Sequence, residues 1–442
     1  MDPRITMQPQ KPQPGARVRV TANDVTYEGI LLPSAEMGTG NILLKLDSGY
    51  NIGIDKTSTI EVLAPPKELS FPIAKLQQKK GLPRIALIAT GGTIGSRVDY
   101  RTGGVHMLLT PEQLLFNVPE LQGIVSIETI ERPFAIASED MYFEEWQEIA
   151  RQVVAALQSG LDGVIITHGT DTLHYTAAAL SFMLQGLDKP VALVGGQRSS
   201  DRGSFDGAMN LVCAAHYMSS GIGEVALVMH AGSDDDACLA IRGTTARKMH
   251  TSRRDAFRPV NQLPLAKIWP DGKIERIHPD PRPASQGASH GRSKVILKDS
   301  FAKVALVKLF PGADPEVLDF HRKQGCKGIV LEGTGLGHVI TQPQDASRSW
   351  IPAIQRCAEA GVLIVISSQC LYGRINQQVY SNLRILHQAG AISAQSMTPE
   401  CAYVKLSWAL GQTTDKDKAA GVFTSDIAGE IAERTLHETF LY

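Results

Sequence analysis

The sequence of 442 residues predicts an α/β fold of two lobes built on parallel sheets, preceded by a small antiparallel β-barrel. Short apolar segments, each followed by Gly, Ser, Thr or Asp, recur from residue 84 onward and alternate with helical patterns. Strands without polar interruptions are buried on both faces, which is typical of a parallel sheet covered by helices. A chain of this length also exceeds what one hydrophobic core supports, so more than one domain is expected.

The first 66 residues predict a polar tail followed by the barrel. The segments RVRVTA, TYEGILL and NILLKLDSGYNIGI alternate between polar and apolar residues and are broken by Gly, Asn and Asp. Six basic and seven acidic residues nearly balance in this part of the chain, so the barrel is not basic enough to bind RNA alone. Residues 67–83 turn to Pro and Lys and predict a linker.

Residues 84–285 predict the larger lobe and residues 286–442 the smaller one. Strands such as RIALIA, GVIIT and VALVM are expected in the first lobe, with helices at Phe143 to Gln158 and Leu173 to Gln185. The polar segment HPDPRPASQGASHGRSK separates the lobes. In the second lobe we expect the strands VALVK, GIVLEG and LIVIS and a helix at Asp314 to Gln324.

Charge and cysteine usage exclude several classes of protein. With 44 basic and 45 acidic residues the net charge is -1, which does not suit an independent nucleic-acid binder. The six cysteines are scattered without a CxxC pair or a zinc spacing, so no metal site is predicted and a reducing compartment is expected. Since neither a signal peptide nor a membrane span is recognisable, we expect a cytoplasmic protein.

Two motifs follow strands of the larger lobe and carry hydroxyl groups. ATGGTIGS places Thr90 and Thr93 around two glycines that allow a sharp turn and a close approach of a ligand. The alternative is a phosphate-binding turn, but the motif matches neither GxGxxG nor GxxxxGK[ST]. HGTDT places Thr170 and Asp171 between a strand and a helix, where a single N-cap residue would suffice, so the surplus favours chemistry.

Two further motifs are uninformative by themselves. Ser138 and Glu139 lie in the segment IASEDM, which alone predicts only a loop. Lys248 lies within the basic run RGTTARKMHTSRR, which is most often a solvated loop.

Together, TGGTI, Ser138-Glu139, HGTDT and Lys248 resemble the bacterial-type L-asparaginase/glutaminase family over roughly residues 84–440. The resemblance implies an asparaginase-type two-lobed fold, a homodimer with active sites near its interface, and catalysis without a cofactor in this chain. Thr93 matches the family's nucleophile and Tyr100 the lid tyrosine that helps activate it. The residues that the resemblance assigns to a Thr-Lys-Asp set are Thr170, Lys248 and Asp171. Ser138 and Glu139 match the pair that binds the substrate's α-carboxylate and α-ammonium, and Gly92 and Gly169 are expected to line the substrate.

The barrel and the motif RKMHTSRRDAFRP resemble one branch of this family, the D subunits of archaeal glutamyl-tRNA(Gln) amidotransferases. This resemblance implies that the chain hydrolyses glutamine and delivers ammonia to a partner, the E subunit. The partner would bind tRNA(Gln), use ATP and Mg, and assemble as two D and two E chains. Two alternatives stay open: a stand-alone cytosolic L-asparaginase, and a non-enzymatic amino-acid sensor.

Overall fold

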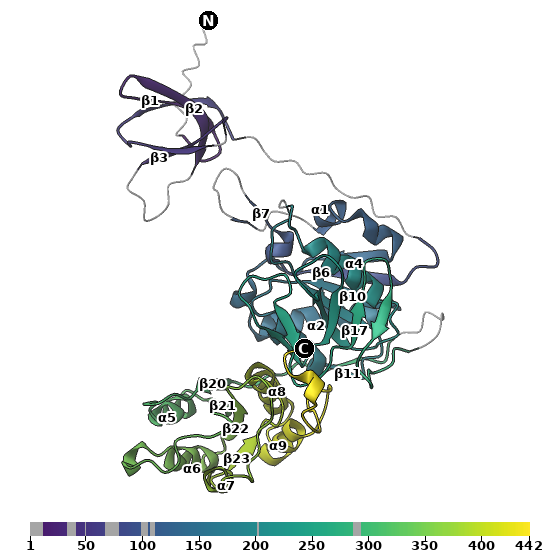
Figure 1. Ribbon diagram of the computed structural model, residues 1–442, viewed down its shortest axis with the longest axis vertical. Coiled ribbons are helices and arrows are strands. Elements are labelled where there is room, and N and C mark those ends of the chain that lie inside the picture. Colours follow the sequence, from purple (N-terminus) through teal and green to yellow (C-terminus); the bar gives the residue numbers. More distant parts are fainter. Residues whose placement is uncertain are drawn as a thin grey trace, which may run out of the picture.

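The computed structural model describes residues 12–32, 41–48, 50–66, 79–98, 105–106, 111–200, 203–285 and 293–442. In chain order these residues form a small antiparallel sheet, a large mixed sheet and a four-stranded parallel sheet, the last two with helices packed on them (Figure 1). The predicted α/β class with a preceding antiparallel sheet is thus confirmed. Residues 67–78 of the predicted linker lie outside the described residues.

The N-terminal sheet has the strand order β4-β3-β2-β1-β5, and every recorded pairing in it is antiparallel. Val18 and Val20 of β1 point into a small core, while Arg17 and Arg19 alternate with them on the opposite face. The five strands are β1 (Arg17–Ala22), β2 (Val25–Leu32), β3 (Ile42–Leu46), β4 (Asn51–Ile54) and β5 (Thr59–Ala64).

The large sheet has the order β18-β17-β14-β13-β12-β10-β6-β9. Its parallel strands are β6 (Arg84–Ala89), β9 (Ser126–Glu131), β10 (Gly163–Thr167), β12 (Val191–Val194) and β13 (Val225–His230). The sequence did not predict the antiparallel extension of β14 (Cys238–Arg242), β17 (Ala266–Ile268) and β18 (Ile274–Arg276). The connection between β13 and β14 is too short for a parallel crossover, so β14 returns beside β13 as a hairpin.

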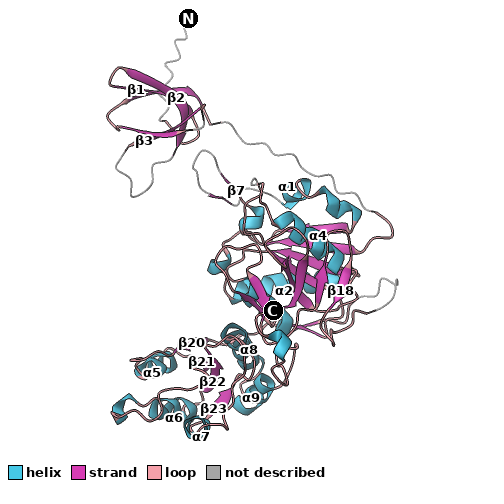
Figure 2. Cartoon of the chain, in the orientation of Figure 1, coloured by secondary structure: helices cyan, strands magenta, loops and turns pink. Residues whose placement is uncertain are grey.

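Helices cover both faces of the large sheet (Figure 2). The helices α2 (Phe143–Gln158) and α3 (Leu173–Met183) share one core cluster with alternate residues of the central strands. The other alternate residues share a second cluster with α4 (Gly207–Tyr217). The bounds of α2 are as predicted, whereas α3 ends two residues early because β11 (Leu184–Gln185) pairs with β19 (Ile296–Leu297).

The second lobe is built on the sheet β20-β21-β22-β23, which is parallel throughout. Its strands are β20 (Val304–Lys308), β21 (Gly328–Gly333), β22 (Leu363–Ser368) and β23 (Ala391–Ser393). One face packs on α5 (Glu316–Lys323), α6 (Ile351–Glu359) and α7 (Ser381–Gln388); the predicted bounds of α5 were slightly too wide. The other face packs on α8 (Pro399–Gln412) and α9 (Lys416–Thr424), which lie opposite α5 and α6 in Figure 1.

Helix α8 also packs against α3 and thereby joins the two lobes in one core cluster. The remaining elements are short and lie around the larger lobe: β7 (Arg97–Val98), β8 (Val105–His106), α1 (Pro111–Phe116), β15 (Ala246–Lys248) and β16 (Phe257–Pro259). No helix within the described ranges combines the length and apolar character needed to cross a lipid bilayer.

Candidate active site

Three loops meet at the carboxyl edge of the large sheet: residues 90–96 after β6, 168–172 after β10 and 195–198 after β12. The carbonyl oxygen of Thr167 accepts hydrogen bonds from the amide and the hydroxyl of Thr90, both at 3.0 Å. The strands are therefore in register up to the point where the loops begin. In an open α/β sheet this edge is where ligands bind.

The first two loops touch through their glycines. Gly92 has φ of 83°, and a Cβ added to it would lie 2.4 Å from the Cα of Gly169. A side chain at position 92 would therefore be strained by its backbone and blocked by its neighbour. Thr93 and Thr170, the residues that directly follow these glycines, consequently stand on adjacent loops.

The amine of Lys248 joins the second loop. Lys248 ends β15, and its Nζ donates to Thr170 Oγ1 at 2.9 Å and to Asp171 Oδ1 at 2.6 Å. The lysine side chain is 10% exposed and the aspartate 65% exposed, so the pair lies at a boundary between protein and solvent. The structure therefore brings together three of the side chains that the sequence singled out.

Ser138 and Glu139 begin a short 3-10 helix beside the second loop. Gly169 leaves room for Ser138, whose Cβ would be 2.8 Å from a Cβ at position 169. Thr172 takes the N-cap position of α3, but its hydroxyl donates to the carbonyl oxygen of Ser138 at 2.5 Å and accepts no capping hydrogen bond from the helix. Ser138 is buried, whereas Glu139 is exposed and its Oε2 lies 3.5 Å from the serine hydroxyl.

The predicted site residues thus fall into three groups. Lys248 contacts Thr170 and Asp171 directly, and Gly92, Gly169 and Ser138 pack on one another. Thr93 and Glu139 are chain neighbours of the packed residues. Tyr100 lies outside the described residues.

Gln197 in the third loop is a candidate that the sequence reasoning missed. Its Oε1 lies 3.5 Å from Thr170 Oγ1, and its Nε2 is buried with no hydrogen-bond partner among the described residues. The carboxylate of Asp206 accepts the amide hydrogens of Gln197 and Arg198, which fixes the loop. The signal was present in the motif VGGQRSSD, where polar residues follow an apolar strand as they do in the other two loops.

Two buried histidines lie at the second loop: His168 is its first residue, and His174 follows it in α3. His168 Nδ1 faces the carbonyl oxygen of Gly169 at 2.6 Å, and Nε2 faces the hydroxyl of Thr176 at 2.9 Å. Because the carbonyl can only accept, Nδ1 carries the proton and the Thr176 hydroxyl donates to Nε2. Burial lowers the pKa of His168 to about 4, so the ring is neutral at pH 7.

His174 lies in the first turn of α3, behind Lys248. Burial and, to a smaller extent, the positive charges of Arg247 and Lys248 lower its pKa to about 3. Arg247 donates to His174 Nε2 at 3.3 Å and forms an ion pair with Glu400 of α8. The strand β15, which carries Lys248, is thereby linked to α3 of the larger lobe and to α8 of the smaller lobe.

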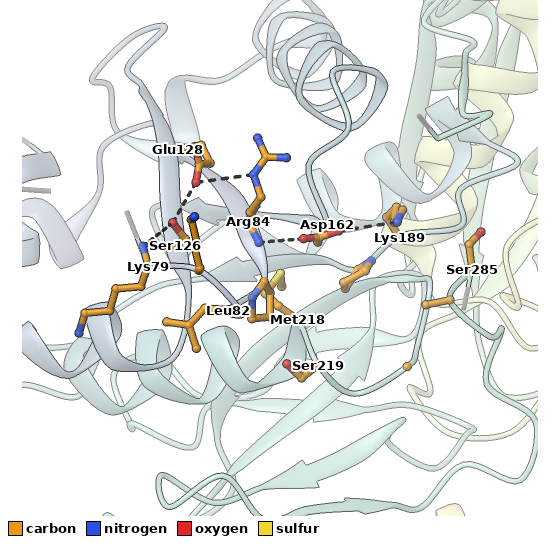
Figure 3. Close-up of a pocket in the computed structure, with 16 residues that line it drawn as sticks. Lys79, Leu82, Arg84, Ser126, Glu128, Asp162, Lys189, Met218, Ser219 and Ser285 are labelled. Atoms are coloured by element: carbon orange, nitrogen blue, oxygen red, sulfur yellow. Dashed lines mark hydrogen bonds and ion pairs between the residues drawn. The ribbon is translucent and has the colours of Figure 1, made fainter. Parts of the chain in front are cut away.

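A cavity of 1060 Å³ lies at the opposite, amino edge of the same sheet (Figure 3). Four of its charged groups form two pairs: Arg84 Nε lies 3.7 Å from Glu128 Oε1, and Lys189 Nζ lies 4.0 Å from Asp162 Oδ1. The cavity contains none of the convergent hydroxyl and amine groups found at the carboxyl edge. We therefore place the chemistry at the carboxyl edge, despite the size of this cavity.

The arrangement at the carboxyl edge suits acyl transfer. A threonine hydroxyl is a weak nucleophile that needs a neighbouring base, and an amine paired with a carboxylate can move a proton. Backbone amides of a glycine turn can stabilise the oxyanion of a tetrahedral intermediate. Within the described residues no group of three or more His, Cys, Asp or Glu side chains is arranged to hold a metal ion.

Three family models match successive parts of the chain. Residues 13–63 match the GatD N-terminal domain, residues 84–281 the N-terminal asparaginase domain, and residues 303–423 the glutaminase/asparaginase C-terminal domain.

Full-length relatives and a solved structure extend these matches. The chain is 49% identical over 438 residues to the D subunit of glutamyl-tRNA(Gln) amidotransferase from Thermococcus kodakarensis, covering 97% of this chain and 96% of the relative. It is 50% identical over 424 residues to the protein of the same name from Pyrococcus furiosus, covering 94% and 93%. The thermostable L-asparaginase from Thermococcus kodakarensis superposes with a TM-score of 0.68 at 29% identity, covering 79% of this chain and 99% of that structure.

Proposed function

This chain belongs to the family of glutamyl-tRNA(Gln) amidotransferase D subunits, and we propose that it hydrolyses the side-chain amide of glutamine at the Thr-Lys-Asp cluster. It is the amidohydrolase component of a tRNA-dependent amidotransferase, which converts Glu-tRNA(Gln) to Gln-tRNA(Gln). The observation that carries the proposed site is the position of Lys248 Nζ, 2.9 Å from Thr170 Oγ1 and 2.6 Å from Asp171 Oδ1.

In the proposed mechanism, Thr93 is the nucleophile and Tyr100 helps to remove its proton. The Thr93 oxygen attacks the amide carbon, ammonia leaves, and water then hydrolyses the acyl-enzyme. Lys248 and Thr170 relay a proton to the departing nitrogen, and Asp171 holds the lysine in place. The closeness of the loops after β6 and β10, joined at Gly92 and Gly169, supports this division of roles.

The substrate's amino-acid end is assigned to Ser138 and Glu139. Ser138 donates to the α-carboxylate, and Glu139 accepts from the α-ammonium, with which a carboxylate forms a charge-assisted hydrogen bond. Gly92 and Gly169 line the substrate, because only residues without side chains fit where their two backbones meet. The amide groups of this glycine turn supply the oxyanion site.

Ammonia requires a protected route in this proposal. In neutral water ammonia is mostly protonated, and ammonium has no lone pair with which to attack an activated ester. We therefore propose that the chain is a homodimer bound to two copies of the E subunit, which supplies the ATP, Mg and tRNA(Gln) binding. This chain needs no cofactor of its own. The near-zero net charge of this chain supports assigning the binding of tRNA to the partner.

Organisation and location complete the proposal. We place the domain boundaries at residues 66, 83 and 285, in keeping with sheets that span residues 17–64, 84–276 and 304–393. A cytoplasmic location suits the six cysteines, which are all free thiols, five of them buried.

The decisive experiment compares glutamine and asparagine hydrolysis by the chain alone and with the tRNA-binding partner. We expect Thr93→Ala and Lys248→Met to abolish glutamine hydrolysis in both settings. Fast asparagine turnover that does not depend on a partner would instead favour a stand-alone L-asparaginase, which the likeness to a solved asparaginase makes the second candidate. An unchanged rate in both variants would leave only an amino-acid sensor.

A further inference from the structure

A series of hydrogen-bonded side chains, which we call the His230 line, leads from Gly195 in the candidate site to the surface. Its members are Asn210, His230, Asp235 and Arg254. Asn210 Nδ2 donates to the carbonyl oxygen of Gly195 at 2.9 Å, and Asn210 Oδ1 lies 2.7 Å from His230 Nδ1. His230 Nε2 lies 3.0 Å from Asp235 Oδ1, which also accepts from Arg254 Nη1 at 2.8 Å. None of these four side chains has a place in the proposed mechanism. His230 is completely buried, whereas Asp235 is 64% exposed.

The orientation of the Asn210 amide is fixed by its neighbours. The carbonyl oxygen of Gly195 can only accept a hydrogen bond, so the amide nitrogen must face it. The same nitrogen also faces the sulfur of Met229 at 3.4 Å, another acceptor. Asn210 Oδ1 is therefore the atom that meets His230, and Nδ1 of the ring must donate to it.

The second ring nitrogen must also donate. Asp235 is 64% exposed and accepts from Arg254 Nη1 at 2.8 Å, and these contacts hold its pKa below its ordinary value, so this side chain is a carboxylate that only accepts. A neutral imidazole has one N–H and could satisfy only one of the two contacts. The contacts therefore require a ring protonated on both nitrogens, with Asp235 as its counter-charge.

One end of the His230 line contacts Gly195, which lies beside Thr170, and the other end lies in the loop that follows Lys248. Gly195 packs on Thr170, whose Cγ2 would be 2.7 Å from a Cβ at position 195, so the Gly195 backbone lies directly against the side chain of Thr170. Arg254 belongs to the loop that follows Lys248 and closes through a hydrogen bond of 2.7 Å from the Met249 amide to the Ala256 carbonyl. The His230 line consequently connects Gly195, which packs on Thr170, with the loop that follows Lys248.

We propose that His230, as an imidazolium held between Asn210 and Asp235, is a positioning residue for amide hydrolysis. It keeps the Thr170 hydroxyl and the Lys248 amine at reacting distance without touching the substrate. The inference rests on the proposed function for its effect on rate, but its statement about the ring is independent of that function.

The other titratable groups near the His230 ring, Cys238 and Asp206, are engaged elsewhere and do not replace Asp235 as its partner. Cys238 pairs with His230 across the sheet, and burial raises the pKa of its thiol, which therefore stays protonated and faces Asn210 Oδ1 at 3.4 Å. Asp206, one turn before Asn210 on α4, is occupied by the amides of Gln197 and Arg198. Asp235 is left as the carboxylate that contacts the ring.

The kinetic test uses Asp235→Ala, Asp235→Asn and the neighbouring exposed Asp236→Ala as a matched control. Asp235→Ala removes the acceptor shared by the ring and Arg254, and we expect kcat to fall about 10- to 100-fold with little change in KM, since misplacement by about 1 Å costs about that much. An asparagine at 235 can turn its amide so that Nδ2 donates to Nε2 of a neutral ring, while the Arg254 guanidinium shifts to donate to the amide oxygen instead. Asp235→Asn should therefore rescue kcat and match the Asp236→Ala control.

The two variants at position 235 separate positioning from simple support. Equal losses of kcat in the Ala and Asn variants at unchanged thermal stability overturn the proposal.

A measurement that needs no activity completes the test. In ¹⁵N NMR of the histidine-labelled full chain at pH 7, with the signals assigned through His230→Asn, both ring nitrogens of His230 should appear protonated. Only one should do so in Asp235→Asn. A singly protonated ring in the unchanged protein overturns the inference even if hydrolysis is normal. A protein that carries the doubly protonated ring but does not hydrolyse glutamine refutes the proposed function and leaves the ring assignment standing.

Discussion

Lys248 is the side chain on which the proposed proton transfer depends, because its amine is the group that reaches both Thr170 and Asp171. Methionine keeps much of the length of lysine but cannot move a proton. A positioned general acid or base contributes about 100- to 10,000-fold to a rate, so Lys248→Met should reduce kcat for glutamine by about that factor. Steady-state release of glutamate measures the effect.

The matched control is Lys273→Met. Lys273 lies on the surface, with its amine 4.3 Å from the ring centre of Trp269, and its replacement should leave the rate unchanged. Equal rates for both methionine variants would remove Lys248 from the mechanism.

Glu139 is expected to determine affinity rather than rate. Its carboxylate is exposed beside the buried Ser138, where it can accept from the α-ammonium of the substrate. A hydrogen bond to a charged group contributes about 1.5–3 kcal/mol, so Glu139→Gln should raise KM for glutamine about 10-fold or more with kcat nearly constant. Initial rates over a range of glutamine concentrations separate the two constants.

Asp140, the next residue in the same short helix, provides the comparison. Asp140→Asn should leave KM unchanged. If both variants raise KM equally, general electrostatic attraction explains the effect and Glu139 has no specific contact.

At the scale of elements, the sequence predicted well wherever local pattern decides structure. The helix at 143–158 has the predicted bounds because a 3.6-residue apolar period fills it completely. The antiparallel edge β14-β17-β18 escaped prediction, since an apolar run such as β14 does not reveal its direction and β17 and β18 are only three residues long. Gln197 escaped because its role depends on a neighbouring loop 27 residues away in the chain.

The junction of β10 and α3 makes stability depend on pH. The pKa of His174 falls from 6.5 in the unfolded chain to about 3 in the folded protein, mainly through burial. Below pH 6.5 the unfolded state binds a proton that the folded state refuses, so stability is lost as the pH falls from 6.5 toward 3. The maximum slope for one such group is about 1.4 kcal/mol per pH unit.

His174→Gln should remove most of this slope between pH 6 and pH 4. Denaturant unfolding at several pH values measures it, with His437→Gln, at an exposed position near the C-terminus, as the control. His168, whose pKa falls to about 4, continues to contribute and should keep some pH dependence in the variant. An unaltered slope would mean that His174 is protonated in the folded protein.

At the scale of the whole molecule, the two lobes act as one body around the strand that carries Lys248. Arg247, its neighbour on β15, pairs with Glu400 of α8 and contacts His174 of α3. The helices α3 and α8 pack together in the core cluster shared by both lobes. A shift of the second lobe would therefore reach the Lys248 amine through Arg247 and through the packing of α8 on α3.

Charge over the whole molecule predicts weak binding of tRNA by this chain alone. The net charge is -1, and on the N-terminal sheet Arg17 is paired with Asp47 and Arg19 with Glu28 and Glu61. A surface whose basic residues are paired with acidic ones gains little from counterion release. Its dissociation constant for tRNA(Gln) should thus lie in the non-specific range, about 10⁻⁴–10⁻⁶ M at physiological salt.

Fluorescence anisotropy with labelled tRNA(Gln) over a salt series tests this division of labour. The chain alone should bind weakly, and Arg19→Ala should change the affinity little, because the arginine's charge is already neutralised by two glutamates. Adding the partner should tighten binding, since the proposed function assigns the phosphate contacts to the partner. Nanomolar binding by this chain alone, lost in Arg19→Ala, would instead make the N-terminal sheet the tRNA-binding module and contradict the assignment of that role to the E subunit.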